Sequence, residues 1–258
     1  MSQLKGKHVL VLGADAIGRG IAIRFAREGA RLAILDPTLA LAQEVADTIE
    51  ASGGCAIAFA GAFDAQVGPT LQTAIAALGG VDVLVNNVLP MPVIAPLEEQ
   101  SADAFNDAFA RVQAAVCAMQ AALPAMQQAG GGRIVNVGHR YGEGVNEALA
   151  AYSCAAWSLA GLTRTAAVDW GRYQITTNLL LPLADTPEVR QCHARRARIM
   201  DLMIEQLPLG RLGDPIEDVG AAALFLASDA CTFVNGETLH GDGGQHVAGP
   251  VLNPARFG

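Results

Sequence analysis

Apolar, β-type runs alternate with helical stretches along the whole chain, and this alternation constrains the fold more than any other feature. The stretches between the runs carry apolar residues at helical spacing, as in Leu39, Ala42 and Val45. Strands that alternate with helices form parallel βαβ units. The sequence therefore predicts an α/β fold: a Rossmann-like, doubly wound sheet of about seven parallel strands flanked by helices, in a single domain over residues 1–258. The predicted strands are His8–Leu12, Arg31–Leu35, Ala56–Ala60, Val81–Val85, Ile134–Val137, Thr177–Leu181 and Glu237–Leu239.

The amino-acid composition limits the kinds of molecule that this chain is expected to bind. Apolar residues make up 52% of the chain and charged residues only 16%, which supports a large core and leaves apolar surface for an oligomer contact. A net charge of −8 argues against nucleic-acid binding. The five widely spaced cysteines lack a C-x-x-C pair, and neither a signal peptide nor an apolar run of about 18 residues is apparent. We expect a cytoplasmic protein with reduced thiols that binds neither nucleic acid, nor membrane, nor metal.

A glycine-rich loop follows the first predicted strand and leads into a helix. Gly13, Ile17 and Gly18 lie in this loop, where glycines let the backbone approach a pyrophosphate and the amino terminus of the helix favours its negative charge. Asp36 closes the second strand, at about the 20-residue spacing at which a carboxylate binds the adenosine ribose and repels a 2′-phosphate. This pattern predicts a dinucleotide site that favours NAD over NADP. The alternative is that these are ordinary turn residues.

Asn86 and Asn87 end the fourth predicted strand. Asn86 is a further candidate for the cofactor site. Its amide can equally brace the strand end against neighbouring strands.

The stretch from Arg133 to Trp170 predicts a strand, a loop punctuated by glycines and a long alanine-rich helix with Tyr152 in its first turns. Ligands of open α/β sheets bind outside the carboxyl ends of the strands. The loop Gly138–Gly144 and Tyr152 are therefore expected where chemistry would occur.

These pieces together resemble the short-chain dehydrogenase/reductase family over essentially the whole chain. The motifs that carry the resemblance are VLVLGADAIGRGIA, Asp36, VDVLVNN, GRIVNVG, AAYSCAAWSLAGLTRTAAVDWGRYQITTNLLLP and LGRLGDPIEDVGAAALFLASDACTFVNGETLHGDGG. The resemblance implies a single Rossmann-like domain that forms a tetramer, binds NAD or NADP and interconverts alcohols and ketones.

The catalytic side chains of that family carry over only in part. The family's tyrosine matches Tyr152, but the lysine four residues later, which lowers the tyrosine pKa and holds the nicotinamide ribose, is replaced by Ala156. The substrate-binding serine falls on His139, and the helix asparagine that supports a proton relay falls on Arg111 or Val112. One of the four side chains is therefore kept.

The cofactor motifs also depart from the family. The family's T-G-x-x-x-G-x-G is one residue short here and begins with Leu12 in place of threonine. Its N-N-A-G becomes Asn86-Asn87-Val88-Leu89, which puts bulk where the backbone normally runs close to the cofactor. After the sixth strand, P-G becomes Pro182-Leu183, and Thr186 follows one residue early. The sequence thus predicts NAD as the cofactor if one binds, or none.

These replacements have a chemical cost. A tyrosine with its ordinary pKa of about 10 is ionised in roughly one molecule per thousand at pH 7, and Ala156 supplies no cation to lower it. Loss of one oxyanion donor typically costs a factor of about 10² to 10³. His139 could replace the missing groups by donating to a carbonyl oxygen or sharing a proton with Tyr152, with Arg140 adding positive charge. The alternative is that His139 and Arg140 are loop residues in a vacated pocket.

Three functions follow from this pattern. The first is a catalytically degenerate member of the family that serves as a structural or regulatory subunit, in a heterotetramer with a competent NAD-dependent alcohol dehydrogenase paralogue of hydroxyacyl type. The second is a divergent NAD(H)-dependent oxidoreductase that uses Tyr152 with His139. The third is a ligand-binding sensor.

Two further segments carry expectations drawn from the resemblance. The long helices, at about residues 102–128 and 148–170, pair across subunits in the family and are expected to form the tetramer contact here. Residues 185–207 match the family's variable substrate lid. Its Arg190, Arg195, Arg196 and Arg198 could contact a phosphate, such as that of a coenzyme A thioester, or form a solvated helix face.

Overall fold

The computed structural model describes residues 2–89, 94–139, 148–194 and 197–248, and it contains one sheet of seven parallel strands in the order β3-β2-β1-β4-β5-β6-β7. This confirms the predicted fold class and all seven predicted strands, with ends that differ by at most two residues. The strands are β1 (His8–Leu12), β2 (Arg31–Asp36), β3 (Cys55–Ala60), β4 (Val83–Asn86), β5 (Gly132–Val137), β6 (Ile175–Pro182) and β7 (Thr238–Gly241).

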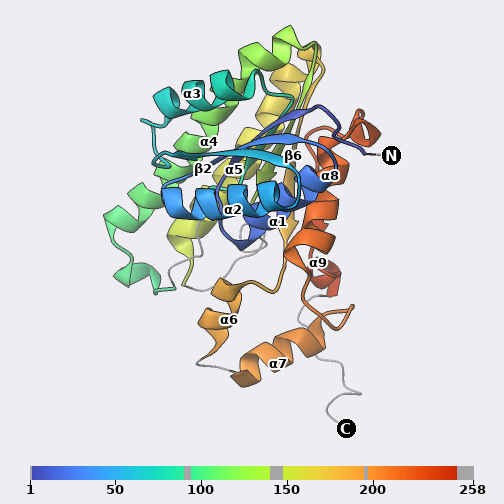
Figure 1. The fold of residues 1–258 in the computed structure, drawn as a ribbon. Helices are drawn as coiled ribbons and strands as arrows, with labels where there is room; N and C mark the ends of the chain where they lie inside the picture. Colours follow the sequence, from blue (N-terminus) through green and yellow to red (C-terminus); the bar gives the residue numbers. More distant parts are fainter. Residues whose placement is uncertain (1, 90–93, 140–147, 195–196, 249–258) are drawn as a thin grey trace.

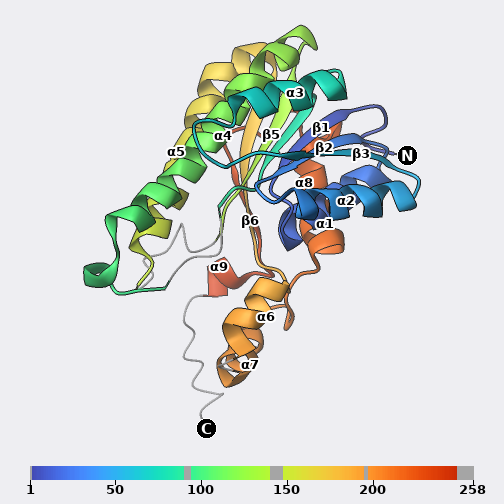
Figure 2. The same cartoon turned by 60° about the vertical axis from the view of Figure 1, so that its left-hand side comes forward.

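Helices cover both faces of the sheet (Figures 1 and 2). One face is covered by α1 (Ala16–Arg27), α2 (Leu39–Ala51) and α8 (Gly220–Ala227). The other is covered by α3 (Gly68–Leu78) and by the two longest described helices, α4 (Ala102–Gln128) and α5 (Ala150–Trp170). Beyond the carboxyl edge of the sheet lie α6 (Pro187–Ala194), α7 (Ala197–Gln206) and α9 (Gln245–Ala248). Short 3₁₀ or π turns occupy Leu97–Glu99, Gly171–Tyr173, Pro215–Val219 and Asp229–Cys231.

Side chains alternate across the sheet and form two separate cores. On β1, Leu10 and Leu12 pack toward α3, α4 and α5, whereas Val9 and Val11 pack toward α1, α2 and α8. A parallel sheet buried on both faces needs apolar residues at every position of its strands. This requirement explains why the strands appear in the sequence as continuous apolar runs.

A chain of buried polar side chains crosses the larger core. Asn86 on β4 donates its amide to the Asn136 side-chain oxygen on β5 at 2.8 Å, and the Asn136 amide donates to the Thr163 hydroxyl on α5 at 2.8 Å. The Thr163 hydroxyl in turn donates to the carbonyl of Leu159 at 2.8 Å. All three side chains are fully or almost fully buried. The hydrogen bonds therefore fix the spacing between the two central strands and α5.

None of the helices in the described ranges is long and apolar enough to cross a membrane.

We predict that Asn136→Leu lowers the free energy of unfolding by about 2 to 4 kcal/mol, because it leaves the buried Asn86 amide without an acceptor and removes the donor to Thr163. Urea denaturation at fixed protein concentration measures this loss. Thr73→Ala is the control, since the Thr73 hydroxyl makes only an exposed bond to the Pro69 carbonyl in α3. A loss below about 1 kcal/mol for Asn136→Leu would contradict a structural role for the chain.

Candidate active site

The candidate site lies at the carboxyl edge of the sheet, where the strand order reverses between β1 and β4. This switch point is where open α/β sheets bind their ligands. The loop after β1, the end of β4, the end of β5 and the segment after β6 meet there, because parallel strands place all their carboxyl ends at one edge.

The structure corrects one predicted boundary: α1 already begins at Ala16, so Ile17 and Gly18 lie in its first turn and not in the loop after β1. Gly13 and Gly18 are both needed for the packing between this loop and the first turn of α1. Gly13 has a φ of +96°, and a Cβ at this position would lie 2.0 Å from the Asn87 carbonyl oxygen. A Cβ on Gly18 would lie 1.9 Å from the Gly13 carbonyl oxygen. Glycine is therefore required at both positions whether or not a ligand binds.

The Asp15 carboxylate occupies the amino terminus of α1. Its Oδ1 accepts hydrogen bonds from the backbone N–H groups of Ile17 and Gly18, each at 3.0 Å, and from the Asn87 amide at 2.7 Å. Unpaired N–H groups at a helix amino terminus form an anion-binding site. Here the chain's own carboxylate takes these bonds. Sequence reasoning missed this role of Asp15, although an aspartate directly before a helix is a recognisable capping signal.

Asp36, the predicted ribose ligand, is 7% exposed at the end of β2. Its Oδ2 accepts a hydrogen bond from the Ala14 N–H at 2.9 Å, and its Oδ1 accepts one from the Thr38 N–H at 2.8 Å. Both oxygens thus hold the backbone of the loops beside them. Asp36 lies next to the loop after β1, as the dinucleotide pattern predicts.

Tyr152 and His139 are brought together. Tyr152 lies in the first turn of α5 and is 7% exposed, and its ring meets the His139 ring edge-on with the centroids 6.3 Å apart. Ala156 is buried one turn further along the same helix, so only a methyl group stands where the family has a lysine. Arg140, the suggested additional cation, lies outside the described residues.

The other candidate positions are not among the residues that line this crevice. The Arg111 guanidinium lies 5.6 Å from the centroid of the Phe63 ring, and Val112 is buried in the core beneath α4. Neither provides the amide that the family places on this helix. Asn86 is fully buried and bound to Asn136 inside the sheet, which matches the bracing alternative.

The crevice between these elements is small. Its lining residues leave a cavity of about 60 Å³, whereas pockets that bind small molecules commonly measure roughly 300 to 1,000 Å³. Apolar side chains at the ends of three different segments contribute to the lining. The lining residues are Asp15, Ile17, Asn87, Leu89, Val137, Gly138, His139, Tyr152, Pro182, Leu183, Ala184, Thr186 and Val189.

The predicted lid forms α6 and α7, beyond the carboxyl edge of the sheet (Figure 2). The Thr186 hydroxyl accepts a hydrogen bond from the Val189 N–H at 3.2 Å. Arg190 forms a two-pronged ion pair with Asp185, and the hydrogen bonds from its guanidinium hold the pKa of the Asp185 carboxyl below its ordinary value. Arg195 and Arg196 lie outside the described residues, and only the backbone of Arg198 is described, within α7. The phosphate role of these arginines stays a prediction.

Comparison with known proteins identifies the family to which the chain belongs. The family model described as Enoyl-(Acyl carrier protein) reductase matches residues 11–246. The chain is 34% identical to an uncharacterised oxidoreductase of Mycobacterium tuberculosis, over 92% of this chain and 90% of the relative. It is 32% identical to the 7alpha-hydroxysteroid dehydrogenase of Escherichia coli K12, over 94% and 95% of the two chains.

Solved structures agree in fold. A hydroxysteroid dehydrogenase from Escherichia coli superposes with a TM-score of 0.82 at 31% identity, covering 94% of this chain and 98% of that one. A structure from Beutenbergia cavernae, provisionally described as an NAD(P) dependent gluconate 5-dehydrogenase, contains bound NADP at low occupancy; it superposes with a TM-score of 0.86 at 32% identity, covering 95% and 98%. The matched fold and the near-complete family match show that this chain belongs to the short-chain dehydrogenase/reductase family of NAD(P)-using oxidoreductases.

Proposed function

We propose that this chain is a non-catalytic member of the family that serves as a structural or regulatory subunit. Its partner is a competent NAD-dependent alcohol dehydrogenase paralogue of hydroxyacyl type, and the two assemble into a heterotetramer. The observation that carries the proposal is the Asp15 carboxylate, which takes the hydrogen bonds of the α1 amino terminus.

A dinucleotide pyrophosphate does not fit beside this carboxylate. Two unit charges about 4 Å apart repel each other by roughly 4 kcal/mol at the effective dielectric constant of about 20 typical near protein surfaces. Moving Asp15 away instead gives up the helix cap, which costs about 0.5 to 2 kcal/mol, and breaks its bond with Asn87. Whether Asp15 stays or moves, pyrophosphate binding is weakened at the helix amino terminus, where the fold normally favours an anion.

Space gives a second, independent argument. The crevice of about 60 Å³ is far below the usual size of a ligand pocket. Leu89 lines it from the position where the family has a small residue, and Leu183 and Val189 line it from the segment after β6. Rearrangement of these side chains would have to precede entry of a nicotinamide ring.

The catalytic positions agree with this reading. Without a lysine beside it, Tyr152 lacks the family's means of lowering its pKa, since Ala156 occupies that position. At the position of the family's serine hydroxyl, this chain carries His139. We therefore assign the chemistry to the partner subunit.

The helices expected at the interface have kept apolar surface. On α5, Trp157 is 51% exposed and Val168 is 82% exposed, and on α4, Phe109 is 39% exposed. Large apolar side chains gathered on neighbouring helices are typical of protein contacts. A kept interface combined with a degenerate site resembles the non-catalytic subunit of a heterotetrameric family member such as 2-(hydroxyphenylmethyl)succinyl-CoA dehydrogenase.

We predict that the purified chain shows no saturable NADH binding up to about 1 mM, by NADH fluorescence and by isothermal titration. Asp15→Asn removes the charge but keeps a side-chain acceptor for the α1 N–H groups, so inorganic pyrophosphate should bind this variant more tightly than the wild type. Asp64→Asn, at an exposed turn with the same kind of backbone bond, is the control. Saturable NADH binding by the wild type would contradict the proposal.

We predict that Trp157→Asp prevents assembly with the paralogue, because it places a charge within the apolar α5 surface. Co-expression followed by light scattering after gel filtration measures the mass of the complex. Leu39→Asp is a matched control, since Leu39 on α2 is also half exposed but lies on the other face of the sheet. A wild-type chain that forms only homotetramers and never co-purifies with a paralogue would remove the main support for the subunit role.

A second candidate function is a divergent NAD(H)-dependent oxidoreductase, favoured by the contact between His139 and Tyr152. On this hypothesis His139→Ala abolishes NADH-dependent reduction of a ketone by the isolated chain, whereas His8→Ala, at the opposite edge of the sheet, leaves it unchanged. We expect neither variant to differ from the wild type, because the wild type has no turnover to lose. Turnover that disappears only with His139→Ala would establish the enzyme instead.

A further inference from the structure

The amino terminus of α5 is capped by a side chain from a distant part of the chain. The first N–H groups of a helix have no partner within it, and the residue directly before the helix usually supplies an acceptor. That residue is Leu149, whose side chain makes no such bond. The Gln100 side-chain oxygen accepts a hydrogen bond from the Ala151 N–H at 2.8 Å instead, across 51 positions of the sequence. The start of α5 therefore depends on the segment that contains Gln100.

That segment makes a second connection to the residues before α5. The Gln100 amide donates to the Ala95 carbonyl at 2.8 Å, and the Ala95 N–H donates to the Ala148 carbonyl at 3.0 Å. A short 3₁₀ turn, Leu97–Glu99, lies between Ala95 and Gln100 and keeps them close together. Residues 95–100 thus bond the backbone on both sides of Leu149.

Tyr152 directly follows the capped residue. It is the third residue of α5, and its ring meets the His139 ring edge-on, with the centroids 6.3 Å apart. His139 belongs to a different element, since it follows the end of β5. We propose that residues 95–100 form a latch, a conformational device that holds the first turn of α5 and so sets the position of Tyr152 against His139.

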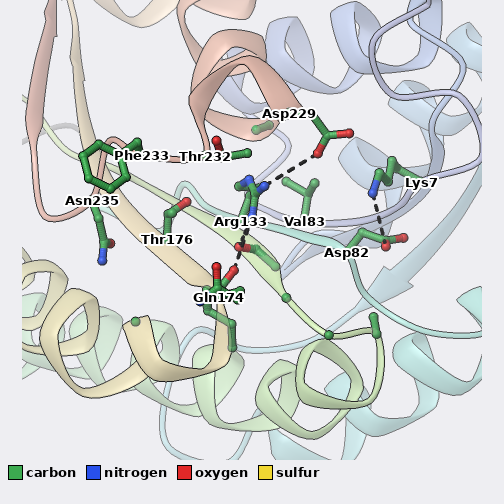
Figure 3. A pocket seen from close by; sticks show the side chains of 17 residues that line it. Lys7, Asp82, Val83, Arg133, Gln174, Thr176, Asp229, Thr232, Phe233 and Asn235 are labelled. Carbon is green, nitrogen blue, oxygen red and sulfur yellow. Dashed lines mark hydrogen bonds and ion pairs between the residues drawn. The ribbon is translucent and has the colours of Figure 1, made fainter.

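Backbone strain marks the point at which the latch acts. Two non-glycine residues among those described have positive φ, Ala148 at +64° and Gln174 at +60°. Gln174 follows the turn after α5, where a left-handed residue commonly ends a helix. Figure 3 shows it beside Arg133, whose guanidinium donates to the Gln174 carbonyl at 3.4 Å. Ala148 instead precedes a helix, and its Cβ makes the left-handed conformation costly. The bond from Ala95 holds the strained residue in place.

The latch also joins the starts of two helices. Gln100 directly precedes Ser101, whose hydroxyl caps α4 by accepting a hydrogen bond from the Ala104 N–H at 3.2 Å. The helices α4 and α5 run side by side (Figures 1 and 2). On the proposed function these helices contact the partner subunit, so the latch lies between that contact and the crevice. This last consequence rests on the proposed function, whereas the latch itself does not.

Hydrogen–deuterium exchange of the purified full-length chain, measured by mass spectrometry, tests the cap. We expect Gln100→Ala to speed exchange of the amides at the start of α5 about three- to tenfold, because the Ala151 N–H loses its acceptor. Gln43→Ala is the matched control, since its exposed side chain donates to Asp47 within α2, and it should leave exchange in α5 unchanged. Unchanged exchange at the start of α5 in Gln100→Ala overturns the proposal.

The position of Tyr152 needs a readout that a loss of stability alone does not move. The NMR signal of the His139 ring senses the neighbouring aromatic ring, and Tyr152→Leu gives the signal without that ring. We expect Gln100→Ala to shift the His139 signal toward its position in Tyr152→Leu. Gln100→Glu keeps an oxygen for the Ala151 N–H and should leave the signal near that of the wild type. A His139 signal that does not move in Gln100→Ala, or that moves equally in Gln100→Glu, contradicts the latch.

The strain gives an independent test by urea denaturation. Ala148→Gly relieves the left-handed strain, so it should raise the urea midpoint more in the wild-type background than in Gln100→Ala, where the start of α5 can relax. Gln174→Gly is the control, and its effect should be equal in both backgrounds. Equal effects of Ala148→Gly in both backgrounds would show that the latch does not hold the strain. All three measurements use the isolated chain without cofactor or paralogue, so their failure is distinct from failure of the subunit role.

Discussion

Burial of both faces of a parallel sheet is the constraint on which the rest of this structure depends. It forces nearly every strand position to be apolar and requires a helix layer on each side, and the crossovers align all strands in one direction. The same arrangement places the starts of the helices and their ends at opposite edges of the sheet. Helices begin at the carboxyl edge of the sheet, where Asp15 caps α1, and they end at the amino edge, around Arg133. The two edges therefore have opposite electrostatic character before any side chain is chosen.

The Asp15 cap and the Asn86–Asn136–Thr163 chain illustrate two different uses of polar side chains. The cap lies at a surface crevice and satisfies groups that a ligand can also satisfy. The buried chain joins two strands to α5, and no ligand can replace it. Loss of ligand binding at the α1 amino terminus is tolerated, because the Asp15 carboxylate satisfies the same N–H groups. Loss of the buried hydrogen bonds is not tolerated, which is consistent with a scaffold that persists around an altered site.

The seven strands and the two longest described helices could be predicted because burial on two faces leaves a strong pattern in the sequence. The carboxyl ends of β4 and β7 are harder to predict from the sequence, because both strands continue past their apolar runs, to Asn86 and Gly241. The position of Asp36 and the approach of Tyr152 to His139 followed from strand ends and family spacing. Asp15 directly precedes α1, and its role as a helix cap could have been recognised from that position. Its bond with Asn87 could not, because it joins segments that are distant in the sequence. The turn of Arg111 toward Phe63 depends on contacts distant in sequence.

The Asp15 cap also changes how this chain is coupled to metabolism. A protein that binds a cofactor only when folded gains stability in proportion to the logarithm of the cofactor concentration above its dissociation constant. A helix end that carries its own counter-charge gains nothing from that linkage. On the proposed function, the stability of this subunit does not depend on the cellular concentration of dinucleotides. Its abundance and its assembly then stay constant while the fraction of the catalytic partner that has bound NAD rises and falls.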